Sequence, residues 1–106
     1  MPKYLVAVSY TADGARGVAK EGGKARVQAA RDLVEGLGGT LETMYFAFGD
    51  ADVYAIVDAP TQSDVAAAAL ALGASGAAST KTTVLLTPEE VDEAARKAVS
   101  YRPPGA

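Results

Sequence analysis

The chain has 106 residues, of which 49% are hydrophobic and 22% are charged, which is typical of one globular domain with a single core. Its formal net charge of −3 argues against nucleic acid as a partner, because nucleic-acid-binding proteins usually present a basic face to the phosphates. The absence of cysteine and histidine excludes disulfides, thiol catalysis, Ser-His-Asp triads and the zinc and haem sites built from these residues.

The N-terminal sequence and the apolar segments predict a cytoplasmic protein without a membrane partner. Residues 1–4 lead directly into a short apolar stretch and lack the basic region and cleavage site of a signal peptide. The longest weakly apolar segment, residues 65–78, is shorter than the roughly 20 residues that a membrane-spanning helix needs.

The first elements along the chain are predicted to be a strand and a helical region. Residues 4–10 are rich in aromatic and β-branched side chains, which suit a pleated strand. Thr11 is placed to cap a short helical turn. Over residues 24–37 the apolar side chains recur at helical spacing, and the glycine pair at 38–39 ends that helix.

A β-hairpin is predicted next. Strands are expected over residues 40–48 and 52–59, and Pro60 ends the second of them. The Gly-Asp-Ala-Asp step at residues 49–52 is typical of a turn between two strands. Such a turn brings two carboxylates and several aromatic rings together at one end of a sheet.

The second half of the chain predicts a helix, a strand and a final helix. The first helix, residues 63–74, is rich in alanine and leucine and begins after Thr61, with an acidic residue placed to complete a capping box. The strand is expected over residues 80–86. Thr87, followed by proline and two glutamates, begins a helix that we expect to extend to about residue 99.

The predicted order β-α-β-β-α-β-α describes an α+β protein with ferredoxin-like topology and an additional C-terminal helix. In that topology two helices cover one face of a four-stranded antiparallel sheet. We expect a single domain over residues 1–100 and an extended tail over residues 101–106. Two prolines stiffen the tail, and Tyr101 is expected to anchor it on the domain or on a partner.

The predicted strands are apolar on both faces, although two helices cover only one face. In the first strand Tyr4 and Val6 alternate with Leu5 and Ala7, and the hairpin strands show the same pattern. A sheet with one solvated face alternates apolar with polar residues, and monomers rarely expose a large apolar patch. The last helix would cover part of this face, but packing against a second copy is the simpler solution, so we expect a homodimer or a higher homo-oligomer.

Several short motifs, taken in order, resemble the GYD domain family, and the resemblance spans essentially the whole chain. The motifs are residues 4–11 (Tyr-Leu-Val-Ala-Val-Ser-Tyr-Thr), the glycine pairs at 22–23 and 38–39, residues 46–52 (Phe-Ala-Phe-Gly-Asp-Ala-Asp), residues 85–90 (Leu-Leu-Thr-Pro-Glu-Glu) and residues 101–105 (Tyr-Arg-Pro-Pro-Gly). The Gly-Tyr-Asp pattern of the family would fall on Gly49, Ala51 and Asp52, so Ala51 departs from it.

The resemblance implies a fold similar to that of dimeric α/β-barrel proteins, and it implies no established activity. Relatives on that fold include cofactor-free monooxygenases, lactone isomerases, haem-degrading enzymes and effector-binding modules, so the fold alone is weak support for any chemistry. Any role of the family's tyrosine is either absent here or taken over by Tyr45 or Tyr54.

The two carboxylates of the predicted turn have two interpretations. Asp50 and Asp52 either build the turn, because aspartate side chains bond to nearby backbone amides, or supply a functional carboxylate. In the second interpretation Asp52 faces an internal pocket as a base or a hydrogen-bond acceptor. Burial among aromatic rings would then raise its pKa, and a nearby Arg26 would lower it.

Hydroxyl-bearing side chains complete the candidate site. Ser9, Tyr10, Tyr45 and Tyr54 either line a pocket between sheet and helices, where tyrosines suit aromatic ligands, or pack in the core with their hydroxyls at the rim. The predicted ligand-binding residues are therefore Ser9, Arg26, Tyr45, Asp52 and Tyr54.

Three functions remain in competition at the level of sequence. The first is a homo-oligomer that binds an apolar or aromatic small molecule. The second is a cofactor-independent oxygenase or isomerase that uses Asp52 with tyrosine hydroxyls. The third is a structural or regulatory association module. In each case we expect neither a cofactor nor a metal.

Overall fold

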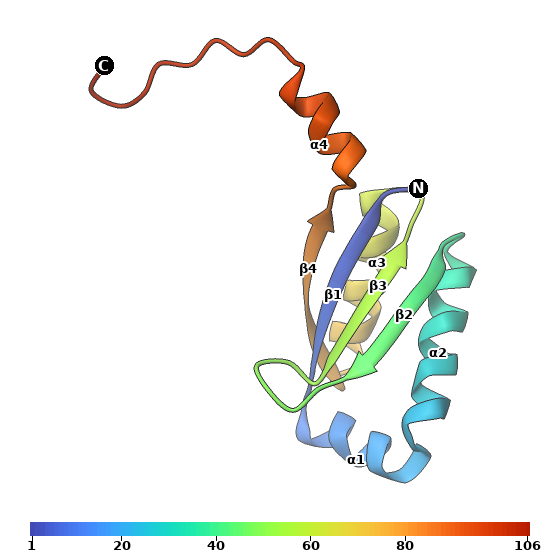
Figure 1. Cartoon of the computed structure of the whole chain (residues 1–106). Coiled ribbons are helices and arrows are strands. Elements are labelled where there is room, and N and C mark those ends of the chain that lie inside the picture. The colour runs from blue at the N-terminus through green and yellow to red at the C-terminus, as the bar shows by residue number, and fades with distance from the viewer.

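A computed structural model describes all 106 residues and confirms the α+β prediction, with eight elements in the expected order (Figure 1). The elements are β1 (Lys3–Tyr10), α1 (Ala12–Glu21), α2 (Gly23–Gly36), β2 (Thr40–Phe46), β3 (Val53–Asp58), α3 (Gln62–Ala74), β4 (Ala78–Leu85) and α4 (Pro88–Ala95).

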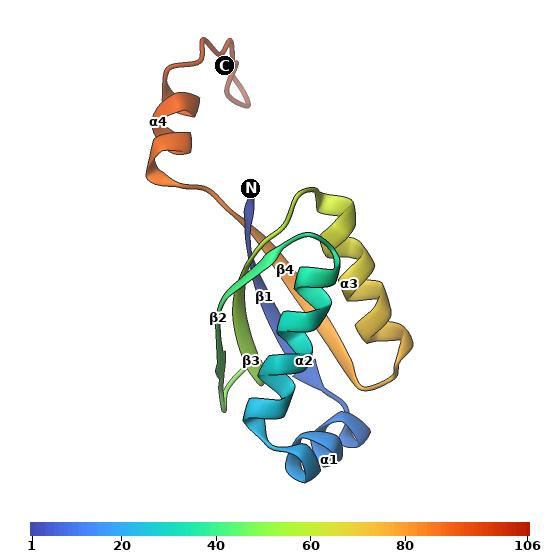
Figure 2. The same ribbon diagram turned by 90° about the vertical axis from the view of Figure 1, so that its right-hand side faces the viewer.

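The four strands form one antiparallel sheet in the order β2-β3-β1-β4, which is the ferredoxin-like arrangement. The first strand is therefore central, and Leu5 lies opposite Ile56 on one side and Thr83 on the other. Helices α2 and α3 both cover the same face of the sheet, and the other face, which we call the open face, has no helix on it (Figures 1 and 2).

The predicted helix starts are confirmed in their hydrogen bonds. At the start of α4 the Thr87 backbone N–H donates to the Glu90 side chain at 3.0 Å, and the Glu90 N–H donates to the Thr87 hydroxyl at 3.1 Å. Thr61 and Asp64 form the same reciprocal pair at the start of α3. These bonds satisfy backbone donors that an α-helix leaves free at its N-terminus.

Several element boundaries differ from the prediction. Strand β2 ends at Phe46, so the β2–β3 loop covers residues 47–52 and Phe48 is fully exposed in it. Helix α4 ends at Ala95, before the predicted residue 99. Both predictions extended an apolar pattern past the point at which the chain has neighbours to pack against.

The buried core is small and lies between the sheet and the two helices. It consists of eight hydrophobic residues, of which Tyr4 and Val53 are the most buried, at 2% and 1% exposed. Six of them are strand residues, and all six lie on the face that the helices cover: Tyr4, Leu41, Val53, Ala55, Val57 and Ala78. The strand alternation predicted from sequence is therefore confirmed on this face.

A glycine makes the closest contact between α1 and the segment before β4. A Cβ atom on Gly14 would lie 2.0 Å from the carbonyl oxygen of Ala77, which also accepts the backbone N–H of Thr11 at 2.9 Å. The absence of a side chain at residue 14 thus lets α1 approach the sheet.

The segment after β4 leaves the body of the domain. Helix α4 and residues 96–106 project beyond the end of the sheet, and every residue from Pro88 onward is exposed (Figures 1 and 2). Helix α4 does not cover the open face. Tyr101 is 73% exposed, so it does not pack on its own domain, and its packing on a partner stays a prediction.

None of the helices combines the length and the apolar character required to cross a membrane.

Candidate functional site

A cavity of about 130 Å³ lies between the sheet and the two covering helices, and we call it the helix-side cavity. It exists because α2 packs along β2 and α3 packs along β4, while the two helices have no extensive contact with each other. The central strands β1 and β3 therefore form its floor, through side chains that include Val6, Val8 and Ala55.

The walls of the helix-side cavity are apolar: 18 of its 22 lining residues are hydrophobic. Helix α2 contributes Leu33 and Val34, and α3 contributes Val65, Ala68 and Leu72. The alanines of α3 leave space between this wall and the floor, because a methyl group fills little of the distance between helix and sheet. Pockets that bind apolar small molecules commonly have this composition.

A few polar groups lie at the two ends of the helix-side cavity. Arg26 belongs to the first turn of α2, and Asp64 belongs to the first turn of α3. The two helices run in opposite directions, so these charged residues lie at opposite ends (Figure 1). Arg26 also pairs with Glu21 at 3.4 Å, and Tyr10 lines the cavity near the Arg26 end.

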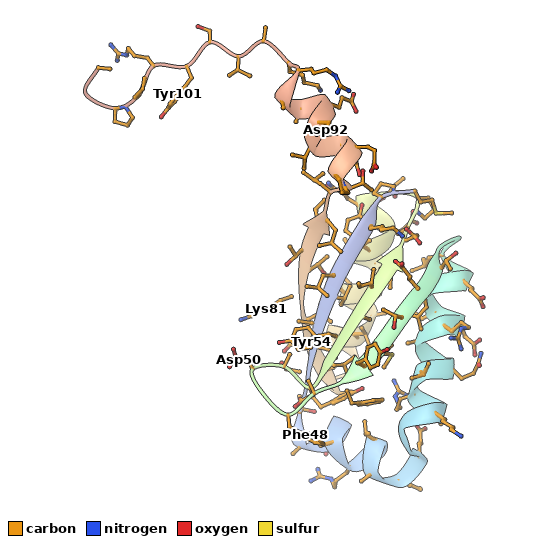
Figure 3. The ribbon with its side chains drawn as sticks, viewed as in Figure 1. Phe48, Asp50, Tyr54, Lys81, Asp92 and Tyr101 are labelled. Carbon is orange, nitrogen blue, oxygen red and sulfur yellow. The ribbon has the colours of Figure 1, made fainter.

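A second cavity lies on the open face, beneath the β2–β3 loop, and we call it the open-face cavity. It has about the same volume, about 130 Å³, but its lining is mostly polar and includes Ser9, Asp50, Tyr54 and Lys81. Figure 3 shows Asp50 and Lys81 projecting on the same side of the molecule, although they form no ion pair.

The structure gives the Asp52 side chain a backbone partner. Its carboxylate accepts a hydrogen bond from the Tyr10 backbone N–H at 2.7 Å, and its own N–H donates to the Val8 carbonyl at 2.8 Å. Asp52 is not among the residues that line either cavity. These contacts agree with the interpretation in which the aspartate holds the loop on the end of β1.

The other predicted site residues fall on two faces of the sheet. Ser9 and Tyr54 line the open-face cavity, and Tyr45, which is 72% exposed, lies opposite Tyr54 on the same face. Arg26 lines the helix-side cavity. Of the four hydroxyl-bearing residues expected between sheet and helices, Tyr10 alone is found there, because side chains of successive strand residues point to opposite faces.

Sequence reasoning missed the contribution of β4 and α3 to the helix-side cavity. Thr80 and Thr82 line it because they lie opposite Val8 and Val6 in the antiparallel register. Ala68 and Ala69 line it from α3. The alanine-rich composition of residues 63–74 was a usable signal, since small residues on one wall either allow close packing or leave space.

A charged cluster occupies the other end of the open face. The Lys3 ammonium group lies 3.0 Å from the carboxylates of both Asp58 and Glu42. The hydrogen bond to Asp58, and then that to Glu42, raises the pKa of Lys3 above its ordinary value of 10.5. The side chains form no group of three or more carboxylates that would hold a metal ion.

Ala51 is 5% exposed and lines the open-face cavity together with Tyr54. Comparison with curated proteins and with solved structures gave no match. The sequence profile described as GYD domain matches residues 4–95, which is most of the chain and includes all four strands. The chain therefore belongs to the GYD domain family.

Proposed function

We propose that the protein binds an apolar or aromatic small molecule in the helix-side cavity. The observation that carries this proposal is the apolar volume of about 130 Å³ between α2, α3 and the sheet. Empty protein cavities of about 150 Å³ with aliphatic and aromatic linings are known to bind benzene, so this volume suits a ligand with a single ring. Arg26 and Tyr10 would meet a polar substituent at one end of such a ligand.

Binding is inferred here in preference to catalysis by Asp52. The Asp52 carboxylate already accepts a backbone hydrogen bond at 2.7 Å and lies outside both cavities. A general base must lie within hydrogen-bond reach of the proton that it removes. A ligand in the helix-side cavity would therefore meet Tyr10 before it met Asp52.

Toluene is a suitable probe, and two alanines of α3 provide matched variants. Ala68 lines the cavity, whereas Ala67 is exposed on the same helix. In an NMR titration we expect toluene to shift the amide signals of cavity residues in the wild type and in Ala67→Leu. We expect Ala68→Leu to weaken binding at least about tenfold, because the larger side chain fills the cavity.

Equal toluene affinity in the two variants, or shifts of amide signals on the open face alone, would contradict the proposal.

Native mass spectrometry of the purified wild-type protein is a separate experiment that identifies a natural ligand bound during expression. A ligand present in the wild type and missing from Ala68→Leu would connect the natural molecule to the same cavity.

We also propose that the protein is a homodimer in which the open faces of two copies pack together. Leu5, Ala7 and Ile56 lie on the open face beside two exposed tyrosines, Tyr45 and Tyr54. No element of the same chain covers them (Figure 2). Apolar sheet faces without a covering layer are stabilised by packing on another sheet.

Sedimentation equilibrium tests this assembly. We expect a dimer at micromolar concentration for the wild type and for the control Ala66→Lys, whose side chain is exposed on α3. Ile56→Lys should shift the equilibrium to monomer, because it places a charge in the middle of the open face. A wild-type protein that stays monomeric at these concentrations would rule out the dimer and would leave the ligand proposal standing.

A further inference from the structure

The C-terminal arm, residues 86–106, has no surface of its own chain to pack against. Leu86, Val91, Val99 and Tyr101 are between 52% and 79% exposed. The Cα radius of gyration is 16.9 Å, whereas a compact domain of this length has a value of about 13 Å. The extra length follows from the arm, which extends the molecule to 57 Å along its longest axis (Figures 1 and 3).

Helix α4 within the arm has the residue pattern of a helix that packs one side on an apolar surface. It has only eight residues, and helices shorter than about 12 residues are marginal in water without tertiary contacts. Val91, Ala94 and Ala95 follow the i, i+3, i+4 spacing of a single apolar stripe, and acidic residues occupy the other side. The stripe is exposed in the single chain, so a surface that covers it would have to belong to another molecule.

The direction of the arm indicates where that surface lies. Figure 2 shows α4 beyond the end of the sheet and displaced to the side opposite the covering helices α2 and α3. The arm thus projects on the side of the open face. A second copy packed on the open face would occupy this side, so the arm would run along it.

The exposed area of the chain agrees with an extensive contact. The accessible surface is 7266 Å², whereas a monomer of 10.7 kDa has about 5,500 Å². The excess, about 1,800 Å² for each chain, is comparable to the 1,200–2,000 Å² that specific interfaces typically bury in total. The open face and the arm would together provide enough area for a stable dimer.

The arm is also long enough to cross a partner. Residues 96–106 extend at most about 40 Å, and a strand of eight residues such as β1 is about 27 Å long. Leu85, at the end of β4 on the open face, and Leu86 join the apolar surface of the open face to that of the arm.

We propose that the arms are exchanged: α4 and the tail of each copy pack on the open-face side of the other copy. This inference rests on the proposed homodimer, and it adds that the interface is incomplete without the partner's arm. Val91 and Tyr101 are the apolar anchors of the contact, because they are the large side chains on the helix stripe and in the tail.

The absence of cysteine allows a direct test with single spin labels. A nitroxide is attached to Glu93→Cys, an exposed position of α4 outside the apolar stripe, in unlabelled protein, which is mixed with ¹⁵N-labelled wild type so that mixed dimers form. We expect amide signals on the open face of the ¹⁵N copy, including those of Leu5 and Ile56, to broaden. The control label at Ala67→Cys, on the far side of the sheet, should leave these signals unchanged.

The outcomes separate this inference from the proposed dimer. A dimer by sedimentation whose ¹⁵N copy shows no broadening from the label at residue 93 would overturn arm exchange and leave the face-to-face dimer in place. A monomer by sedimentation, without broadening, would overturn both.

Paired substitutions provide a second measurement. The double variant Val91→Ser with Tyr101→Ser should raise the dimer Kd at least about tenfold, since anchors of this kind carry most of the binding energy. The control double variant Glu93→Ser with Arg102→Ser changes neighbouring polar side chains and should alter the Kd less than about threefold. All four residues are exposed in the single chain, so the fold is unaffected. Equal Kd values for the two double variants would contradict the arm contact.

Discussion

The Tyr10 backbone N–H donates a 2.7 Å hydrogen bond to the Asp52 carboxylate, which joins the end of β1 to the β2–β3 loop. The same stretch of backbone positions the Tyr10 side chain at the helix-side cavity, while the adjacent Ser9 lines the open-face cavity. The Asp52 carboxylate therefore holds the end of β1, where Tyr10 lines one cavity and Ser9 lines the other. In this arrangement Asp52 is a positioning residue.

Asp52→Asn should lower the free energy of unfolding by about 1 kcal/mol, because an amide oxygen is a weaker acceptor than a carboxylate. Asp50→Asn is the matched control, since Asp50 is exposed in the same loop and makes no side-chain hydrogen bond. Urea denaturation of the two variants measures the difference. Equal stabilities would show that the Tyr10–Asp52 bond contributes nothing.

Two glycines of α1 should respond to alanine in opposite ways. Gly14→Ala should destabilise the protein by about 1–3 kcal/mol, because its Cβ would lie 2.0 Å from the Ala77 carbonyl oxygen. Gly17→Ala should stabilise it by about 0.5–1 kcal/mol, since no atom lies within 4 Å of the new Cβ and alanine favours the helix. Thermal melting of the two variants measures these effects. A change of the melting temperature in the same direction for both variants would refute the close contact at Gly14.

The Lys3 cluster predicts a pH dependence at high pH. The folded-state pKa of Lys3 is raised by Asp58 and then by Glu42, so its contribution to stability is present below the unfolded pKa of about 10.5. The contribution is lost as the pH rises through the higher, folded pKa. The stability difference between wild type and Lys3→Met should therefore be constant from pH 7 to about 9 and should shrink above about 10.5.

Denaturant titrations at several pH values provide this measurement. Lys97→Met is the control, because Lys97 is exposed and forms no ion pair. The stability difference between Lys97→Met and the wild type should not change with pH in the same range. A stability difference for Lys3→Met that persists unchanged at pH 12 would show that the charge on Lys3 does not stabilise the fold.

The guanidinium group of Arg26, at one end of the helix-side cavity, predicts selectivity among ring-containing probes. Arg26→Met should weaken benzoate binding severalfold and leave the toluene affinity within about twofold, because only benzoate offers a carboxylate to the guanidinium. Lys24→Met, an exposed change in the same turn of α2, should affect neither probe. Calorimetric titration of both variants with both probes decides this, and a parallel loss of both affinities would point to altered packing instead.

Local sequence signals determined most of the fold. The alternation in residues 4–10 and the capping threonines at 61 and 87 were sufficient for strands and helix starts, because these features depend on neighbours in the chain. The end of α4 was not predictable in the same way. Alanine and valine continue the helical pattern to residue 99, but nothing in the single chain covers them, and the helix ends at Ala95.

The candidate site was harder to predict because it depends on the two helices remaining apart. Sequence indicates that Val8 and Ala68 are apolar, but it does not show that the space between them stays open. It also grouped Ser9 with Tyr10, although neighbouring strand residues lie on opposite faces. The assignment of each hydroxyl to a cavity required the register of β1 with β3 and β4.

The central place of β1 in the sheet determines the order in which the protein can fold as it is synthesised. This strand is synthesised before both of its hydrogen-bonding partners, which are β3 at residues 53–58 and β4 at residues 78–85. Until then its two edges offer unpaired N–H and C=O groups to other nascent chains. The distant pairings also make the domain fold slowly relative to helical proteins of its size, so β1 stays unpaired for longer during synthesis.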